Sequence, residues 1–112
     1  MVTIEEACKV IQKAIPKTNR IIACSDLKDN YLFEVVPRRW NGDIHDYPCG
    51  GLSEYVEKNS GEYKTMDATS FLDILLAETK QPDELNILPY LSKEDAEFAA
   101  KVQKDREMER VS

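Results

Sequence analysis

The fold of this chain is decided by two runs of sequence, Tyr31-Leu32-Phe33-Glu34-Val35-Val36-Pro37 and Leu52-Ser53-Glu54-Tyr55-Val56-Glu57-Lys58-Asn59-Ser60-Gly61-Glu62-Tyr63-Lys64. The first run predicts a strand over 31–36 that ends at Pro37, because proline has no N–H to donate to a ladder. The second predicts a hairpin of strands 52–58 and 62–66, closed around Asn59-Ser60-Gly61, where glycine is free to take a positive φ. Connections this short favour antiparallel pairing.

Alternation along the 31–36 strand separates its side chains onto two faces. One face is wholly apolar and should meet a helix; it carries Tyr31, Phe33 and Val35. The other face is only partly polar, which indicates that it is covered as well; it carries Leu32, Glu34 and Val36.

The N-terminal residues predict an amphipathic helix. Thr3-Ile4-Glu5-Glu6 has the pattern of a capping box, in which Thr3 and Glu6 each accept a hydrogen bond from the other's backbone. One helical face is apolar and includes Ala7 and Ile11, and Pro16 disfavours helical geometry at Ile15. A helix of this kind needs a sheet on which to bury its apolar face. The run 20–25 predicts the first strand of that sheet.

The second half of the chain is less regular. Residues 70–78 favour a short buried helix, with a strand as the alternative. Ser92 begins a Ser-x-x-acid helix start, and the helix should extend to about Arg110 with a charged, frayed or projecting end beyond Gln103. We therefore expect an α+β domain over 1–112. An N-terminal helix packs on a four-stranded antiparallel sheet, and C-terminal helices follow, with 80–112 as a C-terminal helical extension.

Composition places the chain among ordinary globular domains. It has 112 residues, of which 42% are hydrophobic and 32% are charged. No apolar run approaches the roughly 20 residues that span a bilayer, and the N-terminus lacks the basic and apolar regions of a signal peptide. We therefore expect a cytoplasmic protein with no membrane partner. Its three cysteines form no Cys-x-x-Cys pair, which argues against a disulfide framework or a zinc site, and Cys8 and Cys24 fall in apolar patterns that predict burial.

Negative charge is concentrated in one part of the chain. Residues 41–84 contain ten acidic and three basic residues, a net charge of −7, whereas the whole chain carries −6. Such a segment repels phosphate backbones and disfavours nucleic acid as a partner. It attracts a basic protein surface, although an acidic surface that only promotes solubility is an equally simple interpretation.

The long loop over 37–51 holds the candidates for chemistry. Asp43, His45, Asp46 and Cys49 are suitable metal ligands, but their spacing matches no defined site. Cys49 precedes two glycines and lies four residues from the only histidine, His45, so a thiol enzyme is a further alternative. Neither pattern identifies a catalytic constellation. The sequence predicts no catalytic residue, no metal site and no cofactor.

A protein-binding surface fits this loop better. Trp40 and Tyr47 are residue types that recur at binding hot spots, and acidic and guanidinium groups flank them. The predicted partner-binding residues are Arg38, Arg39, Trp40, Asp43, Asp46, Tyr47, Glu54 and Glu57. The alternative for Trp40 is that it covers an edge of the core.

The order of the elements resembles small bacterial immunity domains of the YrhB-like kind, the immunity protein 35 family, over about residues 4–66. The resemblance lies in the N-terminal helix, the strand over 31–35, Gly50-Gly51 and the hairpin Val56-Glu57-Lys58-Asn59-Ser60-Gly61-Glu62. It implies a helix packed on an antiparallel sheet and the neutralisation of a toxin, and it supplies no catalytic residue. We therefore expect a binding protein that occludes a basic site on a bacterial toxin. The alternative is a small-ligand-binding or regulatory module without catalytic activity.

Overall fold

The computed structural model describes residues 1–48, 53–66, 72–74, 76–78 and 81–111. A five-stranded sheet has the order β4-β3-β2-β1-β5, and each neighbouring pair is antiparallel. Its strands are β1 (Asn19–Asp26), β2 (Asn30–Pro37), β3 (Ser53–Glu57), β4 (Tyr63–Met66) and β5 (Asp83–Leu85). The predicted α+β class with an antiparallel sheet is confirmed, whereas the predicted number of four strands is wrong.

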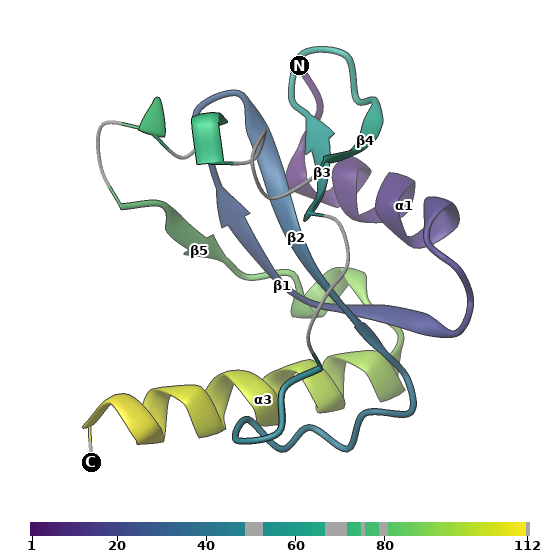
Figure 1. The fold of residues 1–112 in the computed structure, drawn as a ribbon. Coiled ribbons are helices and arrows are strands. Elements are labelled where there is room, and N and C mark those ends of the chain that lie inside the picture. Colours follow the sequence, from purple (N-terminus) through teal and green to yellow (C-terminus); the bar gives the residue numbers. More distant parts are fainter. Residues whose placement is uncertain (49–52, 67–71, 75, 79–80, 112) are drawn as a thin grey trace.

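Helix α1 (Ile4–Ala14) has the predicted boundaries and packs on one face of the sheet (Figure 1). Thr3 Oγ1 accepts a hydrogen bond from Glu6 N at 3.2 Å, and Glu6 Oε1 accepts one from Thr3 N at 3.3 Å, which completes the capping box. The helix stops before Ile15, whose extended backbone (ψ 152°) is the geometry that a following proline imposes. Its apolar face closes a core with Ile21, Phe33 and Val56 of the sheet.

The two faces of β2 are divided as predicted. Phe33 is buried in the core beneath α1, and Tyr31 and Val35 pack against that core. Val36 belongs instead to a second core on the opposite face of the sheet, so that face is covered too. The β3–β4 hairpin also has its predicted turn, in which Gly61 takes a φ of +73°.

Strand β5 was not predicted. It pairs with the outer edge of β1 through Cys24, Ser25 and Asp26, and only three residues long it is too short to establish an alternating pattern. Asp83 and Glu84, two of the three residues of β5, are acidic and exposed. Such a sequence is typical of a connector rather than of a strand. Residues 80–112 therefore contribute to the sheet as well as supplying the C-terminal helices.

Of the helix predicted over 70–78, residues 70, 71 and 75 lie outside the described residues. Residues 72–74 and 76 are helical, but Leu72 and Leu76 are 53% and 74% exposed, so the prediction of a buried helix is wrong for these residues. Glu78 connects the end of this segment to the turn between β1 and β2 by accepting a hydrogen bond from Lys28 N at 2.8 Å.

A short 3-10 helix, η1 (Leu88–Tyr90), connects β5 to the long helix α3 (Lys93–Val111), which crosses the second face of the sheet (Figure 1). Ala99 and Val102 of α3 close the second core with Ile22, Val36 and Trp40. The helix remains regular to Val111 and its last residues, 107–111, are exposed, so of the two alternatives for this end the structure shows a projecting helix. Among the described helices, α3 included, none combines the length and apolar character needed to cross a membrane.

Candidate functional site

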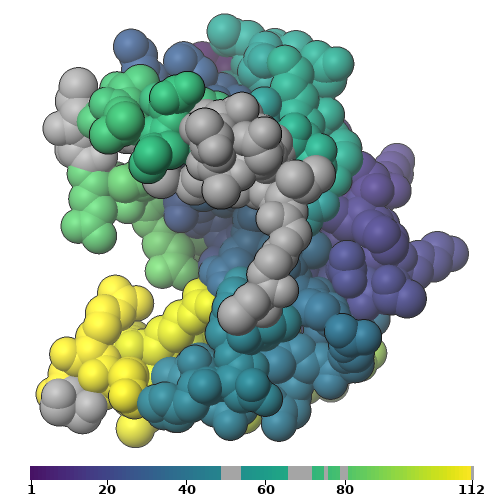
Figure 2. Space-filling model, in the orientation of Figure 1, coloured from purple at the N-terminus to yellow at the C-terminus, as the bar shows by residue number. Residues whose placement is uncertain are grey.

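A groove lies on the second face of the sheet, between the C-terminal half of α3 and the β1–β5 edge. It consists of a cavity of about 520 Å³ beside Ile44 and Tyr47 and a cavity of about 480 Å³ beside β5. Both cavities are lined by Glu34, Arg106 and Arg110. Figure 2 shows the hollow between the yellow end of α3 and the green residues around β5. We call the two cavities together the α3 groove.

An ion pair separates the two halves of the α3 groove. Arg106 donates to both carboxylate oxygens of Glu34, at 2.7 and 2.5 Å, in the forked geometry that makes arginine–carboxylate pairs strong. Each side chain is less than a third exposed, at 29% and 28%. Burial by itself raises the pKa of Glu34, but the hydrogen bonds from Arg106 and Tyr47 and the charge of Arg106 bring that pKa below its ordinary value.

Tyr47 belongs to the same network. Burial is the main reason that its pKa is raised, and the hydrogen bond to the Glu34 carboxylate raises it further, so its hydroxyl remains protonated. The guanidinium of Arg106 lies 5.6 Å from the centre of its ring. Tyr47 is 38% exposed and, with Ile44, lines the half of the α3 groove away from β5, which we call the apolar half.

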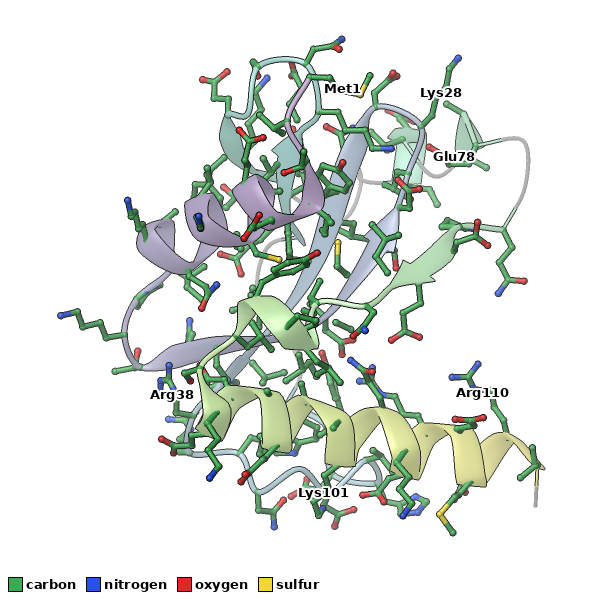
Figure 3. The ribbon with its side chains drawn as sticks, turned by 180° about the vertical axis from the view of Figure 1, so that it is seen from behind. Met1, Lys28, Arg38, Glu78, Lys101 and Arg110 are labelled. Carbon is green, nitrogen blue, oxygen red and sulfur yellow. The ribbon has the colours of Figure 1, made fainter. Side chains whose placement is uncertain are left out.

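The half of the α3 groove beside β5 is polar. A β-bulge in β1 at Ile22 turns Ile22 and Ala23 towards the α3 side of the sheet. The Ile22 carbonyl accepts a hydrogen bond from Gln103 Nε2 at 2.8 Å, which satisfies a backbone group at the bulge and fixes Gln103 in the wall. Arg110 rises from the last turn of α3 on the side that faces β5 (Figure 3).

The α3 groove has an acidic excess. Its lining contains four acidic residues, Glu34, Asp83, Glu84 and Glu109, and two basic residues, Arg106 and Arg110. The net charge of its walls is therefore −2 when all six groups are ionised. The wall formed by β5 is acidic, whereas the wall formed by α3 carries Arg106 and Arg110 together with Glu109.

Trp40 is not part of an exposed surface. It is 8% exposed, packs edge-to-face on Tyr47 and Phe98 at centroid distances of 5.3 and 5.8 Å, and donates from Nε1 to the Asp46 carbonyl at 2.8 Å. Trp40 therefore belongs to the second core, and its part in a partner interface stays a prediction. Its burial anchors the 38–48 loop to α3 and thereby presents Tyr47 and Ile44 to the groove.

The other predicted partner-binding residues are not gathered in one patch. Arg38 lies at the opposite end of α3, where it forms a bidentate pair with Asp95 at 2.8 and 3.2 Å (Figure 3). Arg39, Asp43 and Asp46 are exposed in the loop. On β3, Glu54 accepts from the Tyr63 hydroxyl at 2.7 Å and Glu57 pairs with Lys64 at 3.0 Å, and neither lines the α3 groove. Among the described lining residues of the α3 groove, Tyr47 is the one that belongs to the predicted partner-binding set.

The alternatives for chemistry in the 37–51 loop receive little support from its geometry. Asp43 Oδ1 accepts a hydrogen bond from His45 N at 2.9 Å, which is the geometry of a polar turn. The His45 imidazole is 71% exposed and lies 3.7 Å from Glu109. Among the residues that the structure describes, no group of three or more metal-ligating side chains is present. Cys49, the proposed nucleophile, lies outside the described residues.

Sequence reasoning did not identify Glu34 and Arg106 as partners. Glu34 is the one charged residue in an otherwise apolar strand, which is a signal that a cation covers it. Several basic residues of α3 were equally plausible partners, and only the position of α3 on the sheet selects Arg106.

Comparison with known proteins adds no further constraint, since no family model, curated protein or solved structure matches this chain.

Proposed function

We propose that this chain is a binding protein without catalytic activity, and that it receives a basic segment of a partner protein in the α3 groove. The observation that carries this proposal is the groove itself, a concave surface with an acidic excess beside an exposed aromatic ring. Interfaces commonly place an aromatic anchor beside complementary charge.

The biological setting that we propose is the neutralisation of a bacterial toxin in the cytoplasm, as the resemblance to small immunity domains implies. An immunity protein of this kind acts by occlusion, so it needs a shaped and charged surface but no reacting group. The −7 charge of residues 41–84 supports a basic partner, because it steers the two surfaces together before contact.

The proposed surface differs from the one expected from the sequence. It retains Tyr47 and adds Glu34, Glu84 and Arg106, while Trp40 becomes the buried support of the loop. Glu54 and Glu57 are engaged by neighbours within the sheet and do not belong to it.

Co-expression with the protein encoded beside this chain tests the proposal. If that protein stops growth, the wild-type chain should restore growth and should bind it with an affinity that falls as salt rises. Glu84→Lys reverses a charge on the β5 wall and should weaken binding about tenfold or more, because a basic partner would then face a like charge.

Glu97→Lys is the matched control. It makes the same charge change at an exposed position of α3 that lines neither cavity, so binding and growth should remain as in the wild type. Failure to restore growth, or equal effects of the two reversals, would contradict the proposal. Circular dichroism establishes that both variants are folded.

A small-ligand-binding role is the second candidate. The apolar half of the groove, about 520 Å³, has the size of a small-molecule site and combines Ile44 and Tyr47 with the guanidinium of Arg106. An aromatic carboxylate could place its ring against Ile44 and Tyr47 and its carboxylate near Arg110, since Arg106 is already paired with Glu34. Titration with benzoate and phenylacetate, followed by NMR, should then shift the Tyr47 resonances in the wild type and not in Ile44→Glu.

A further inference from the structure

A separate pocket lies at the other end of α3, away from the α3 groove. It has a volume of about 230 Å³ and lies where the turn after α1, the start of β1, the end of β2 and the first turn of α3 meet. Its charged lining residues are Lys17, Arg20, Arg38 and Asp95. These four groups sum to a net charge of +2, in a protein whose overall charge is −6.

Arg20 is unusual in this pocket because its guanidinium is buried but not fully hydrogen-bonded. It is only 8% exposed, and its Nε has no hydrogen-bond partner among the described residues. Its Nη2 donates to the Arg38 carbonyl at 3.0 Å, and its Nη1 lies 3.6 Å from Asp95 Oδ1, beyond a good hydrogen bond. A buried guanidinium is stable when its charge and its donors are matched, and here both are matched incompletely.

Asp95 is shared between Arg20 and Arg38, so its single negative charge compensates only one of the two guanidinium groups. Its two oxygens accept from Arg38 at 2.8 and 3.2 Å, so Arg38 already uses the carboxylate in a bidentate pair. The face of the Phe98 ring lies 3.7 Å from the Arg20 guanidinium carbon and covers one side of that group. The cluster of two arginines and one aspartate therefore retains one positive charge, and Lys17 adds a second at the pocket.

We propose that this pocket binds a small divalent oxyanion of the phosphate class, held by Arg20 and Arg38 with Lys17 beside it. Such an ion carries the two negative charges that the four groups lack, and its oxygens accept hydrogen bonds from guanidinium donors. The site is distinct from the proposed partner-binding groove, and it stands if that proposal fails.

Inorganic phosphate at pH 7.5 is the probe, and sodium chloride at equal ionic strength is its control. The Arg20 Nε–Hε resonance of the wild-type chain should shift in a saturable way with phosphate and remain in place with chloride. O-phosphoserine in a parallel titration identifies the source: binding tighter than that of phosphate assigns a phosphoryl group on a larger molecule, and weaker binding assigns the free ion.

Arg20→Met should weaken phosphate binding at least about tenfold, because it removes charge-assisted hydrogen bonds. The substitution leaves Arg38 and Asp95 as a neutral pair, so no buried charge remains without a counter-charge. Arg39→Met is the matched control, since Arg39 is exposed and does not line this pocket, and it should bind phosphate as the wild type does.

The increase in melting temperature with phosphate provides a second measurement, and its loss in Arg20→Met separates specific binding from the general stabilising effect of phosphate. An Arg20 resonance that does not respond to phosphate in the wild type overturns the proposal, whatever the fate of the variants. Equal phosphate responses in the wild type and Arg20→Met overturn it as well.

Discussion

Both terminal nitrogens of Arg106 in α3 donate hydrogen bonds to the carboxylate of Glu34 in the middle of β2, although the two residues are 72 positions apart in the chain. The pair lies at the junction of the two halves of the α3 groove. The pair therefore holds α3 in place on the sheet, and the position of α3 determines the shape of the proposed binding surface.

Glu34→Gln should lower the free energy of unfolding by about 1–3 kcal/mol, because it weakens charge-assisted hydrogen bonds in a partly buried site. Urea unfolding measures the change. Glu97→Gln, at an exposed position of α3, should remain within about 0.5 kcal/mol of the wild type. A double-mutant cycle with Arg106→Met should show coupling, and additive effects would contradict a direct interaction.

The same pair predicts loss of stability in acid. Because the folded-state pKa of Glu34 is below its ordinary value of 4.5, its contribution is present above pH 4.5 and is lost as pH falls through the lower folded-state pKa. Melting temperatures measured from pH 7 to pH 3 should therefore fall more steeply in the wild type than in Glu34→Gln. Parallel curves for the two proteins would show that Glu34 is not responsible.

Trp40→Ala should cost about 3–5 kcal/mol, the usual effect of removing a buried aromatic ring. Tyr47→Ala truncates a residue that is 38% exposed and should cost less. Urea unfolding of the two variants makes the comparison. If Trp40→Ala leaves stability unchanged and only weakens partner binding, Trp40 acts in the interface rather than in the core.

Cys8 and Cys24 should be protected from alkylation in the folded protein. Burial raises the pKa of Cys8 to about 12, and burial is also the main cause of the raised pKa of Cys24, so little of the reactive thiolate forms at neutral pH. Mass spectrometry after brief treatment with iodoacetamide should find both thiols unmodified in buffer. Both should be modified in urea, and rapid modification of either in buffer would contradict the structure.

Thr3→Ala should destabilise the protein by about 0.5–2 kcal/mol, because the first turn of α1 loses a capping hydrogen bond. Thr18→Ala is a suitable comparison at an exposed position in the turn before β1, and its effect should be smaller. Thermal unfolding resolves this difference. Equal effects would mean that the Thr3 cap contributes no stability.

The parts of the fold that follow from the sequence are those that neighbouring residues encode. Thr3, Glu6 and Pro16 are local signals, and they predicted both ends of α1 correctly. The division of β2 into two buried faces followed from the alternation of its side chains, and the hairpin turn followed from Gly61.

The parts that were missed depend on contacts between distant residues. Strand β5 exists because its three residues reach the free edge of β1, and nothing within Asp83-Glu84-Leu85 predicts that position. Trp40 and Tyr47 were both predicted as anchors, and they differ in the structure because α3 covers Trp40 and leaves Tyr47 partly exposed. The candidate site was missed for the same reason, since the groove exists only where α3 diverges from β5.

The contacts of α3 also determine its position along its own axis. Ala99 and Val102 are the fully buried apolar residues that α3 contributes to the second core, and both are small. Asp95, Gln103 and Arg106 bind Arg38, the Ile22 carbonyl and Glu34 at three heights that span about 16 Å of helix. A shift of one turn would break all three contacts together, so these polar residues give the helix a single register on the sheet.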